Sequence, residues 1–373
     1  MRNHRAKNMK FIAHFSRIFV GVIFIFSGLI KLNDPVGTEI KLEEYFDVFA
    51  TDFPAMAGFW HFWVPYALYV SIFLCALELV LGVCLLVQYK LKSASWILLA
   101  TVIFFGFLTF YSAYFNKVTD CGCFGETIKL KPWTSFWKDM VLMFFILIIL
   151  WQRNIFADKK TGMWVGMSIV FCLFLGVYAV KFLPPYDGLP YAVGQDIPKN
   201  MKPSEPLKFK YIYEKDGKTL ELNDMPTDTT YKFKEMITLN EEAAKAKITD
   251  YNIWKDGDST DYKAESFVGK KLMIVIPVVA KASTDDIDKI KSLAKSLEGS
   301  DIKVWILSGS PEEEINNFRH ENQLAVPAYS SDTKVLKTIG RANPTIWLLQ
   351  DGIVKGKWAH AETPDKAEVI SKF

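Results

Sequence analysis

Long apolar runs alternate with short polar segments through the first half of the chain, and this pattern stops near residue 183. Five such runs cover residues 11–30, 64–87, 94–115, 136–151 and 163–182. Because a helix of about 20 apolar residues crosses a bilayer, the first four runs predict a four-helix membrane domain over residues 1–160. The fifth run predicts a further transmembrane helix within residues 161–183, which leads into the rest of the chain.

The first apolar run is predicted to stay in the mature protein. A cleaved signal peptide ends in a small-residue cleavage site, whereas this run is followed by Lys31-Leu-Asn-Asp34. We therefore expect a retained transmembrane helix at this position.

The second half of the chain has the pattern of a soluble protein. Residues 184–246 are predicted to be a linker with a β-hairpin, because residues 207–223 alternate between apolar and polar and turn at residues 215–217. A short helix is expected over residues 240–247. Residues 247–373 predict an α/β domain, with strands at 271–279 and 302–308, helices at 285–297 and 311–323, and a hairpin of 345–349 and 353–358.

Positive charge predicts the orientation in the membrane. Basic residues gather in the amino-terminal tail, at Lys90 and Lys92, and at Arg153, Lys159 and Lys160, and cytoplasmic segments carry such an excess. The tail and these two loops are alternate segments between the predicted spans, so they lie on the same side of the membrane. The acidic segment after the first run is then external, and five crossings place the carboxyl-terminal half there too. We therefore expect a protein of the bacterial inner membrane with a cytoplasmic amino terminus and a periplasmic carboxyl-terminal domain.

The amino-acid composition limits the classes of molecule that the protein is expected to bind. The 373 residues are 50% hydrophobic, with a mean hydropathy of +0.13 and a net charge of +3. So small a charge argues against nucleic acid as a partner. The lipid bilayer is the partner that the sequence predicts most directly.

Cysteine is the main candidate for chemistry. The chain has five cysteines, and none occurs after Cys172. Cys75, Cys84 and Cys172 fall inside predicted spans, whereas Cys121 and Cys123 stand one residue apart between the third and fourth runs. Only this last pair is expected to meet an oxidising compartment and soluble partners.

The Cys-Gly-Cys spacing suits reversible oxidation. A one-residue spacer makes disulfide geometry hard to satisfy, Gly122 relaxes the backbone, and a strained disulfide is more oxidising than a structural one. The positive charge of Lys117 would lower a thiol pKa nearby. We therefore predict that Cys121 and Cys123 are catalytic. The alternatives are a static disulfide, two free thiols, and half of a metal site; a metal is least favoured, since His61 is the only histidine near enough to add a ligand.

Glu78 is a second candidate, because it lies inside the second run. It shares a helical face with Cys75 and Gly82 and stands roughly 21 Å from the outer boundary by helical rise. A carboxyl inside a membrane is functional by default. Two interpretations stay open: a proton relay beside a quinone, and a protonated side chain that bonds a neighbouring helix. Asp139, in contrast, is expected to be an interfacial carboxylate balanced by Lys138.

Several motifs together resemble a known family. They are Arg17-Ile-Phe-Val-Gly21, Phe26-Ser-Gly-Leu-Ile-Lys31-Leu-Asn-Asp34-Pro35, Glu78-Leu-Val-Leu-Gly82 and Asp120-Cys-Gly-Cys-Phe-Gly125. Over residues 11–155 the chain resembles the DoxX-like membrane proteins, in the branch that includes the methylamine-utilisation protein MauE. Residues 132–139 are similar to the form found in Bacteroidetes, in which a fifth helix and an exported domain follow. The resemblance implies a membrane core tied to thiol or quinone redox chemistry, and it links MauE to maturation of a disulfide-rich periplasmic dehydrogenase subunit.

Residues 247–373 resemble a thioredoxin-like domain of the peroxiredoxin or TlpA type, through the order of their elements and through Asn343-Pro344-Thr345 before the last hairpin. That family carries Cys-x-x-Cys after the first long strand, where this chain has residues 279–285 without cysteine. Thioredoxin catalysis therefore does not transfer to this domain. The resemblance places Pro344 at a peptide-binding edge, which makes it the candidate for client binding; a stabilising appendage without a binding role is the alternative.

Two functional hypotheses follow from these features. In the first, the protein is a membrane thiol–disulfide oxidoreductase whose Cys121 and Cys123 exchange electrons with a periplasmic client, a membrane redox partner or a quinone. In the second, it is a non-enzymatic scaffold or a subunit of a larger membrane complex, with a fixed disulfide and a docking domain. Quinone is the one cofactor that the sequence brings into consideration.

Overall fold

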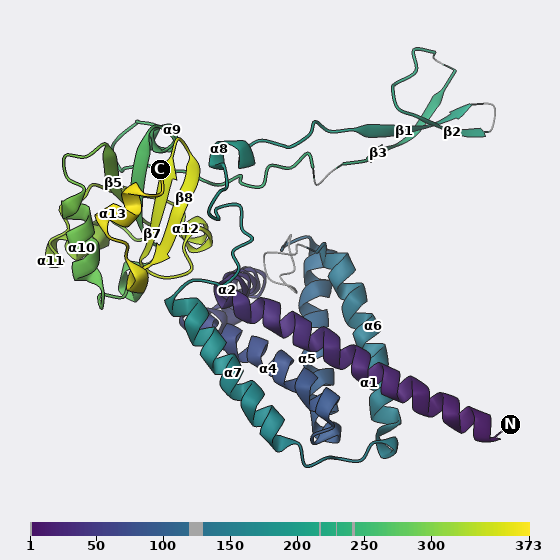
Figure 1. The fold of residues 1–373 in the computed structure, drawn as a ribbon. Coiled ribbons are helices and arrows are strands. Elements are labelled where there is room, and N and C mark those ends of the chain that lie inside the picture. The colour runs from purple at the N-terminus through teal and green to yellow at the C-terminus, as the bar shows by residue number, and fades with distance from the viewer. Residues whose placement is uncertain (1, 119–129, 216–217, 229, 241–242) are drawn as a thin grey trace. The chain divides into compact units, whose positions relative to one another are not determined.

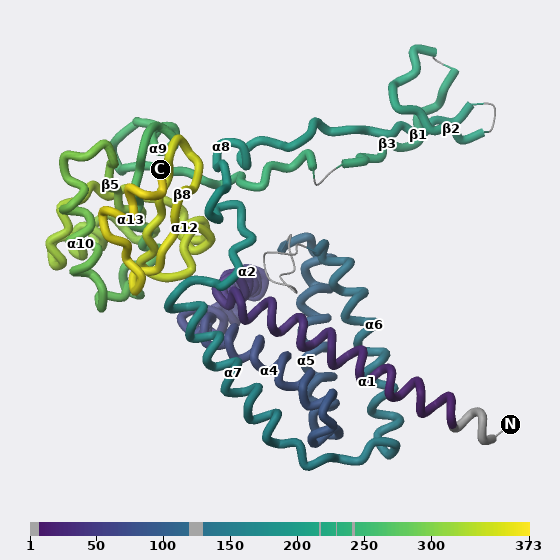
Figure 2. Tube along the Cα trace, in the orientation of Figure 1, coloured from purple at the N-terminus to yellow at the C-terminus, as the bar shows by residue number. Residues whose placement is uncertain are grey.

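The computed structural model describes residues 2–118, 130–215, 218–228, 230–240 and 243–373 (Figure 1). Contacts divide the chain into two units, one formed mainly by residues 1–189 and the other mainly by residues 190–373. The first unit is helical, and the second contains two β-sheets. Figure 2 traces the chain through both units from the amino to the carboxyl terminus.

Long helices make up the first unit. The described α-helices are α1 (Arg2–Asn33), α2 (Pro35–Asp52), α3 (Ala57–Trp63), α4 (Ala67–Val87), α5 (Leu91–Phe115), α6 (Pro132–Trp151) and α7 (Gly162–Lys181). Five helical stretches are long and apolar enough to cross a membrane: α1, α4 together with the short helical turns before it, α5, α6 and α7. The prediction of five apolar helices in this half of the chain is therefore confirmed.

The acidic segment after α1 is a helix rather than a loop. Asp34 caps α2, because its Oδ1 accepts a hydrogen bond from the backbone N–H of Gly37 at 3.1 Å, and Pro35 occupies the first turn. Both features favour the start of a helix. On its apolar side, α2 buries Tyr45 and Phe49 in a cluster with residues of α5. The chain between the first two spans is thus folded onto the bundle.

Glycines let α1 and α4 approach closely. A Cβ atom at Gly82 of α4 would lie 2.7 Å from the carbonyl oxygen of Gly21, and one at Gly28 of α1 would lie 2.8 Å from the backbone nitrogen of Leu79. Small residues at such contacts allow the backbones of membrane helices to pack together. The register between α1 and α4 is therefore fixed by backbone contact.

We expect Gly82→Ala to destabilise the bundle by about 1–3 kcal/mol, because the added methyl meets backbone atoms that cannot move aside. Thermal unfolding of the intact protein in detergent measures this. Gly166→Ala in α7 is the matched control, since nothing lies within 4 Å of a Cβ there. Equal stability of the two variants would show that the close contact of α1 and α4 contributes nothing.

A small antiparallel sheet in the second unit has the strand order β2-β1-β3. Its strands are β1 (Phe209–Lys215), β2 (Lys218–Leu222) and β3 (Lys232–Thr238). The predicted hairpin of β1 and β2 is confirmed, with Lys215 opposite Lys218. The sequence pattern misses β3, whose residues are largely exposed.

The short helix expected over residues 240–247 is wrong for the part of that segment that the structure describes. The side chain of Asn240 accepts a hydrogen bond from the backbone N–H of Lys208 at 2.7 Å. The carbonyl of Ala243 accepts bonds from the backbone N–H groups of Ser204 and Glu205 at 3.1 Å each. Such bonds offer the backbone an alternative to a helix, so this segment forms turns against residues 204–208.

The larger sheet has the order β6-β5-β4-β7-β8. Its strands are β4 (Lys270–Ile276), β5 (Ile302–Ser308), β6 (Ala328–Ser330), β7 (Thr345–Gln350) and β8 (Ile353–Ala359). Strands β4, β5 and β6 run parallel, and β7 runs antiparallel to β4. The turn between β7 and β8 has φ of 50° at Asp351 and 79° at Gly352, as a two-residue hairpin turn requires. The four longer strands confirm the predicted ones.

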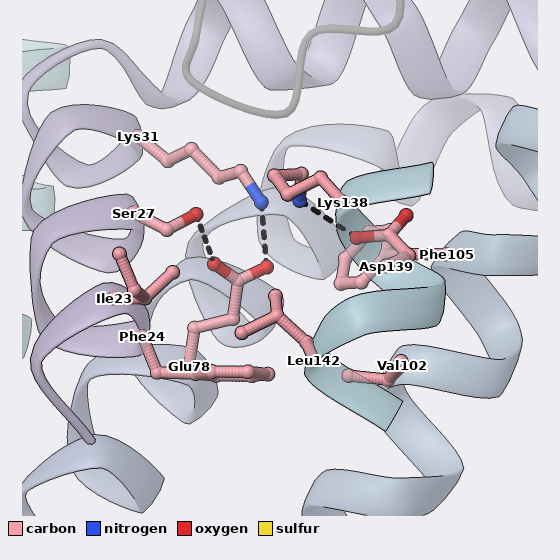
Figure 3. A pocket seen from close by; sticks show the side chains of 10 residues that line it. All are labelled: Ile23, Phe24, Ser27, Lys31, Glu78, Val102, Phe105, Lys138, Asp139 and Leu142. Carbon is pink, nitrogen blue, oxygen red and sulfur yellow. Dashed lines mark hydrogen bonds and ion pairs between the residues drawn. The ribbon is translucent and has the colours of Figure 1, made fainter. Parts of the chain in front are cut away.

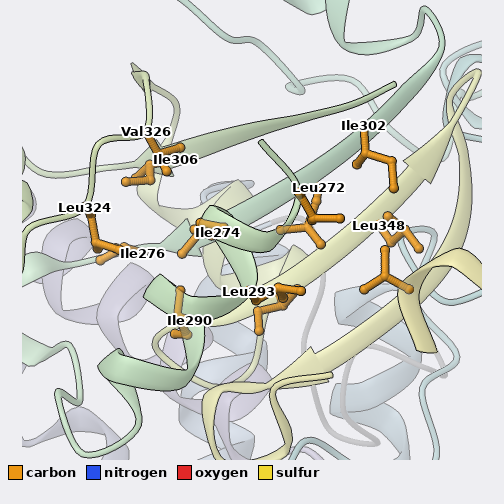
Figure 4. Packing of buried hydrophobic residues seen from close by; sticks show 14 of the residues in the cluster. Leu272, Ile274, Ile276, Ile290, Leu293, Ile302, Ile306, Leu324, Val326 and Leu348 are labelled. Atoms are coloured by element: carbon orange, nitrogen blue, oxygen red, sulfur yellow. The ribbon is translucent and has the colours of Figure 1, made fainter. Parts of the chain in front are cut away.

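Helices cover both faces of the larger sheet. They are α8 (Ile197–Asn200), α9 (Tyr262–Ser266), α10 (Ile287–Ser296), α11 (Glu312–Glu321), α12 (Thr333–Ile339) and α13 (Lys366–Ile370). On one face, Leu272 and Ile274 of β4 pack with Ile290 and Leu293 of α10 (Figure 4). On the other face, the alternate residues of β4 pack with tryptophans of β5 and β7 and with α12. The sheet is therefore the centre of this unit.

Lys271 is a charge buried on this sheet. It is 2% exposed, its ammonium donates to the carbonyl of Val268, and it lies 5.3 Å from the centre of the Trp305 ring. Burial lowers the pKa of Lys271 below its usual value of 10.5. Between the lowered pKa and 10.5, the unfolded chain binds more protons than the folded one, so stability rises with pH across that window.

We therefore expect Lys271→Met to raise the unfolding temperature at neutral pH, where the cost of the buried charge is fully present. The difference from the unchanged protein should shrink as the pH approaches 10.5. Tryptophan fluorescence during heating of the intact protein in detergent reports it. Lys303→Met is the matched control, because Lys303 stands opposite Lys271 on β5 and is 64% exposed; the same effect in both variants would contradict the assignment to burial.

Candidate functional site

The helical unit buries a group of charged side chains between α1, α4 and α6 (Figure 3). Lys31 Nζ of α1 lies 2.5 Å from Glu78 Oε1 of α4. Ser27 Oγ, one turn before Lys31, donates to Glu78 Oε2 at 2.8 Å. The ammonium of Lys31 also lies 4.6 Å from the centre of the Phe105 ring of α5. Both oxygens of the Glu78 carboxylate are therefore held by α1.

A second ion pair lies on α6. Lys138 Nζ lies 2.6 Å from Asp139 Oδ1, and Thr109 Oγ1 of α5 lies 3.4 Å from Asp139 Oδ2. Asp139 is 2% exposed. We use the name ion-pair cluster for Ser27, Lys31, Glu78, Thr109, Lys138 and Asp139.

The two ion pairs border one small cavity. Its volume is about 20 Å³, counted as the space in which the centre of a water molecule fits, and this is room for about one water molecule. The charged side chains line it together with Ile23, Phe24, Val102, Phe105 and Leu142. Two ammonium groups and two carboxylates balance, so the cluster can be neutral while each member keeps its charge.

The cluster lies toward one end of the bundle. Lys31 stands two residues before the end of α1, and Asp139 is the eighth residue of α6. We name this end, where α1 ends and α6 begins, the loop end. Glu78 is thus nearer to the loop end than the count from residue 64 predicts, because residues 54–66 form separate short helical turns before α4 begins at Ala67.

The expectation for Asp139 is half confirmed. Its ion pair with Lys138 is present. Asp139 is not exposed at the bundle surface, however, since it is buried and lines the cavity beside Glu78. The reason is that Asp139 faces the bundle interior, while the neighbouring Trp137 is 63% exposed.

Cys75, Glu78 and Gly82 all face α1, as their spacing predicts. The carbonyl of Cys75 lies 3.0 Å from a Cβ built at Gly28 of α1. Its thiol lies 3.8 Å from Thr38 Oγ1 and does not line the cavity. Cys75 is therefore a packing residue beside the ion-pair cluster.

Cys121 and Cys123 lie outside the described residues, and Pro344 directly precedes β7 in the second unit. Lys117, which was expected to act on the thiols, has a described partner of its own. Its Nζ lies 3.1 Å from Asp52 Oδ1, and the hydroxyl of Tyr111 donates to Asp52 Oδ2 at 2.5 Å. These two bonds lower the pKa of the Asp52 carboxyl, so Lys117 is paired with a carboxylate.

Neither a metal nor a quinone fits the described site. Within the described residues, no group of three or more His, Cys, Asp or Glu side chains could hold a metal ion. The cavity at the cluster admits about one water molecule, which is far less than a quinone ring needs. The arrangement suits the movement of protons between buried carboxylates and water.

Sequence reasoning missed most of the ion-pair cluster. Lys31 and Lys138 stand near helix ends, where positive charge is ordinary, and Ser27 carries no charge. One signal was present: Ser27 and Lys31 are four residues apart and share a helical face. That face could be assigned to Glu78 only once the contact of α1 with α4 was known.

The fold and the cluster together define a membrane protein with a buried charge site and a separate α/β unit. Residues 9–152 match a family model described as methylamine utilisation protein MauE. This stretch reaches from α1 to the end of α6 and contains every member of the ion-pair cluster, so this part of the chain carries a MauE family domain. No curated protein and no solved structure matches the chain.

We expect Lys31→Met to destabilise the bundle by about 3 kcal/mol, because it leaves the buried Glu78 carboxylate without its counter-charge. The double variant Lys31→Met, Glu78→Gln should recover most of this loss, since no charge is then left unpaired. Thermal unfolding in detergent of the single and double variants measures the coupling.

Lys41→Met provides the control for this cycle. Lys41 and Glu44 form an ion pair at 3.1 Å whose side chains are 16% and 27% exposed, and partly solvated pairs contribute about 1 kcal/mol or less. If Lys31→Met and Lys41→Met had equal effects, the Lys31–Glu78 pair would not be a structural centre of the bundle.

Proposed function

We propose that this protein is a MauE-type membrane protein that couples thiol–disulfide exchange at Cys121 and Cys123 to proton movement at the ion-pair cluster, and that it assists the maturation of an exported protein. The family match over residues 9–152 is to a methylamine utilisation protein. It supports the maturation role, because the resemblance to MauE implies maturation of an exported dehydrogenase subunit. The observation that carries the proposal is a pair of buried carboxylates around a water-sized cavity in a membrane bundle.

The cluster has the composition of a proton-handling site. Glu78 and Asp139 each hold an ammonium group and a hydroxyl, so either carboxylate can take up a proton when its lysine moves away. One water molecule in the cavity would join the two carboxylates. Charged groups in a membrane are costly and mark proton or ion paths.

The proposed exchange balances without a further oxidant. A thiolate of Cys121 or Cys123 attacks a disulfide of the partner, which gives a mixed disulfide and one partner thiolate. The second cysteine then displaces the partner's other sulfur. In this direction the protein ends with a disulfide and the partner with two thiols, and the reverse of the same steps oxidises the partner. Two electrons move in either case, and the two protons that the attacking thiols give up pass by way of a carboxylate to the two displaced thiolates, so no net proton is released.

The α/β unit is proposed to bind the client. Parallel β4 and β5, antiparallel β7 beside β4, and the β7–β8 hairpin support the resemblance to a thioredoxin-like domain. The unit has no cysteine, so its contribution would be binding rather than exchange. Pro344 at the start of β7 is the proposed contact with an extended segment of a periplasmic client.

A scaffold without redox chemistry is the second candidate, and the small sheet favours it. On that sheet Leu220, Phe233 and Met236 are 38%, 58% and 46% exposed. Exposed apolar groups on one sheet are suited to binding another protein. In this candidate the cysteine pair stays oxidised, and the protein acts as a subunit of a larger membrane complex.

Trapping of thiols in intact cells separates the two candidates. We expect the alkylated fraction of Cys121 and Cys123 to change between reducing and oxidising growth, and Cys123→Ser to accumulate a mixed disulfide with a partner. Glu78→Gln should slow the change, because the proton acceptor is lost. Mass spectrometry of the alkylated protein gives the fractions.

Cys84→Ala is the control, since Cys84 is buried in the apolar core of the bundle and should alter neither result. A pair that keeps one oxidation state under both conditions, with maturation of exported proteins intact in a Cys121→Ser, Cys123→Ser variant, would favour the scaffold.

A further inference from the structure

We propose that the ion-pair cluster exchanges protons with the loop end of the bundle alone, so that it serves chemistry on that side and does not carry protons across the membrane. This inference rests on the proposed proton-handling role and adds the side from which the protons come. It is carried by the distribution of polar and apolar side chains around the cavity.

The charged groups and three of the apolar side chains lie on opposite sides of the cavity, while Phe105 lies beside the charged groups (Figure 3). Lys31 and Lys138 lie on the side of the loop end, near the end of α1 and the start of α6. Phe24, Val102 and Leu142 form the opposite wall. Each of these three comes from the part of its helix that leads away from the loop end.

Beyond that wall the bundle interior is closed by a continuous apolar cluster. Four helices contribute to it, each from the part that leads away from the loop end. The residues are Val20 and Phe24 of α1, Leu81 and Leu85 of α4, Leu98 and Val102 of α5, and Leu142, Ile146 and Ile149 of α6. None of these side chains is more than 5% exposed. From Glu78 to Leu85 this layer is about 10 Å thick by helical rise, and the entry of a bare ion into such a region is strongly unfavourable.

Among the described residues, no buried hydroxyl group bridges the layer. Ser16 of α1 and Ser95 and Thr101 of α5 are buried on that side of the cluster, and each donates to a carbonyl of its own helix, at 2.8, 2.8 and 2.9 Å. The α1–α4 contact leaves no space either, since a Cβ at Gly82 would lie 2.7 Å from the Gly21 carbonyl oxygen.

A buried positive charge stands at the far side of the layer. Arg17 Nη1 donates to the carbonyls of Leu85 and Leu86 at 2.6 and 2.8 Å, at the end of α4. A fixed guanidinium at the mouth of a path repels protons, as it does in pores that exclude them. A proton from that end would therefore have to pass both a positive charge and a dry layer.

Within the part of the chain that the structure describes, the titratable groups that face Glu78 are Lys31 from α1, Lys138 and Asp139 from α6, and Cys75 on α4 itself. Helix α5 contributes Phe105 and Thr109, which do not titrate near neutral pH, and α7 contributes Cys172 near Cys75. All of the carboxylates and ammonium groups among them belong to the ion-pair cluster.

The test uses the full chain with Cys121→Ser and Cys123→Ser, reconstituted in vesicles whose inner and outer pH are set independently. Orientation is read from a tag inserted at Gly188, within the helical unit. This tag marks the loop end, because Asn33 near the end of α1 donates to the carbonyl of Tyr186 at 2.8 Å and accepts from its backbone N–H at 3.0 Å. Infrared difference spectra follow the carboxyl bands, which Glu78→Gln and Asp139→Asn assign.

We expect the carboxyl bands to change with the pH on the tag side and not to change with the pH on the other side. Ile146→Thr, which places a hydroxyl in the dry layer, should restore part of that response, whereas Leu147→Thr on the 48% exposed side of α6 should not. Bands that follow the opposite pH, both pH values or neither would overturn the inference. Because the exchange cysteines are absent, this result is independent of whether the thiols cycle.

Discussion

The ion pair between Lys31 and Glu78 is the interaction on which the helical unit depends. Lys31 Nζ and Glu78 Oε1 lie 2.5 Å apart in a bundle of helices long and apolar enough to cross a membrane. Neither charge is solvated by bulk water, and a buried charge without a partner is strongly destabilising. α1 must therefore hold one register against α4. The glycines on both helices make that register accessible, since only backbones without Cβ atoms between them approach so closely.

The second ion pair extends the same constraint to α6. Lys138 and Asp139 are neighbours in sequence, so their pairing alone would leave α6 free to turn. Burial of Asp139 next to the Lys31–Glu78 pair fixes which face of α6 points inward, and Thr109 adds a contact from α5. Because each pair is neutral as a whole, the two pairs can face one small cavity without bringing net charge into the bundle.

The transmembrane helices and the strands β4, β5, β7 and β8 follow from the sequence because each is a long apolar run with a clear period. Glu78 is conspicuous for the same reason, as a charge inside such a run. The groups around it are not, because Lys31 and Asp139 stand close to the ends of their apolar runs, where a charge is ordinary in a sequence. Only contact between helices separated by more than 40 residues brings them together with Glu78. The acidic composition of α2 does not indicate a helix, although Asp34 and Pro35 are typical of a helix start. The turn at Asn240 depends on hydrogen bonds to residues 204–208, which no local sequence pattern contains.

The division of cysteine and charge between the two units limits how the proposed chemistry can run. The α/β unit has no cysteine, so in the proposed exchange every electron passes through Cys121 and Cys123, and a client bound by the α/β unit would bring its own sulfur to them. The protons released there have acceptors in the same unit as the cysteines, since Glu78 and Asp139 both lie within the MauE-matched stretch. Under this proposal the α/β unit could change its client without disturbing electron or proton transfer, because it would contribute to neither.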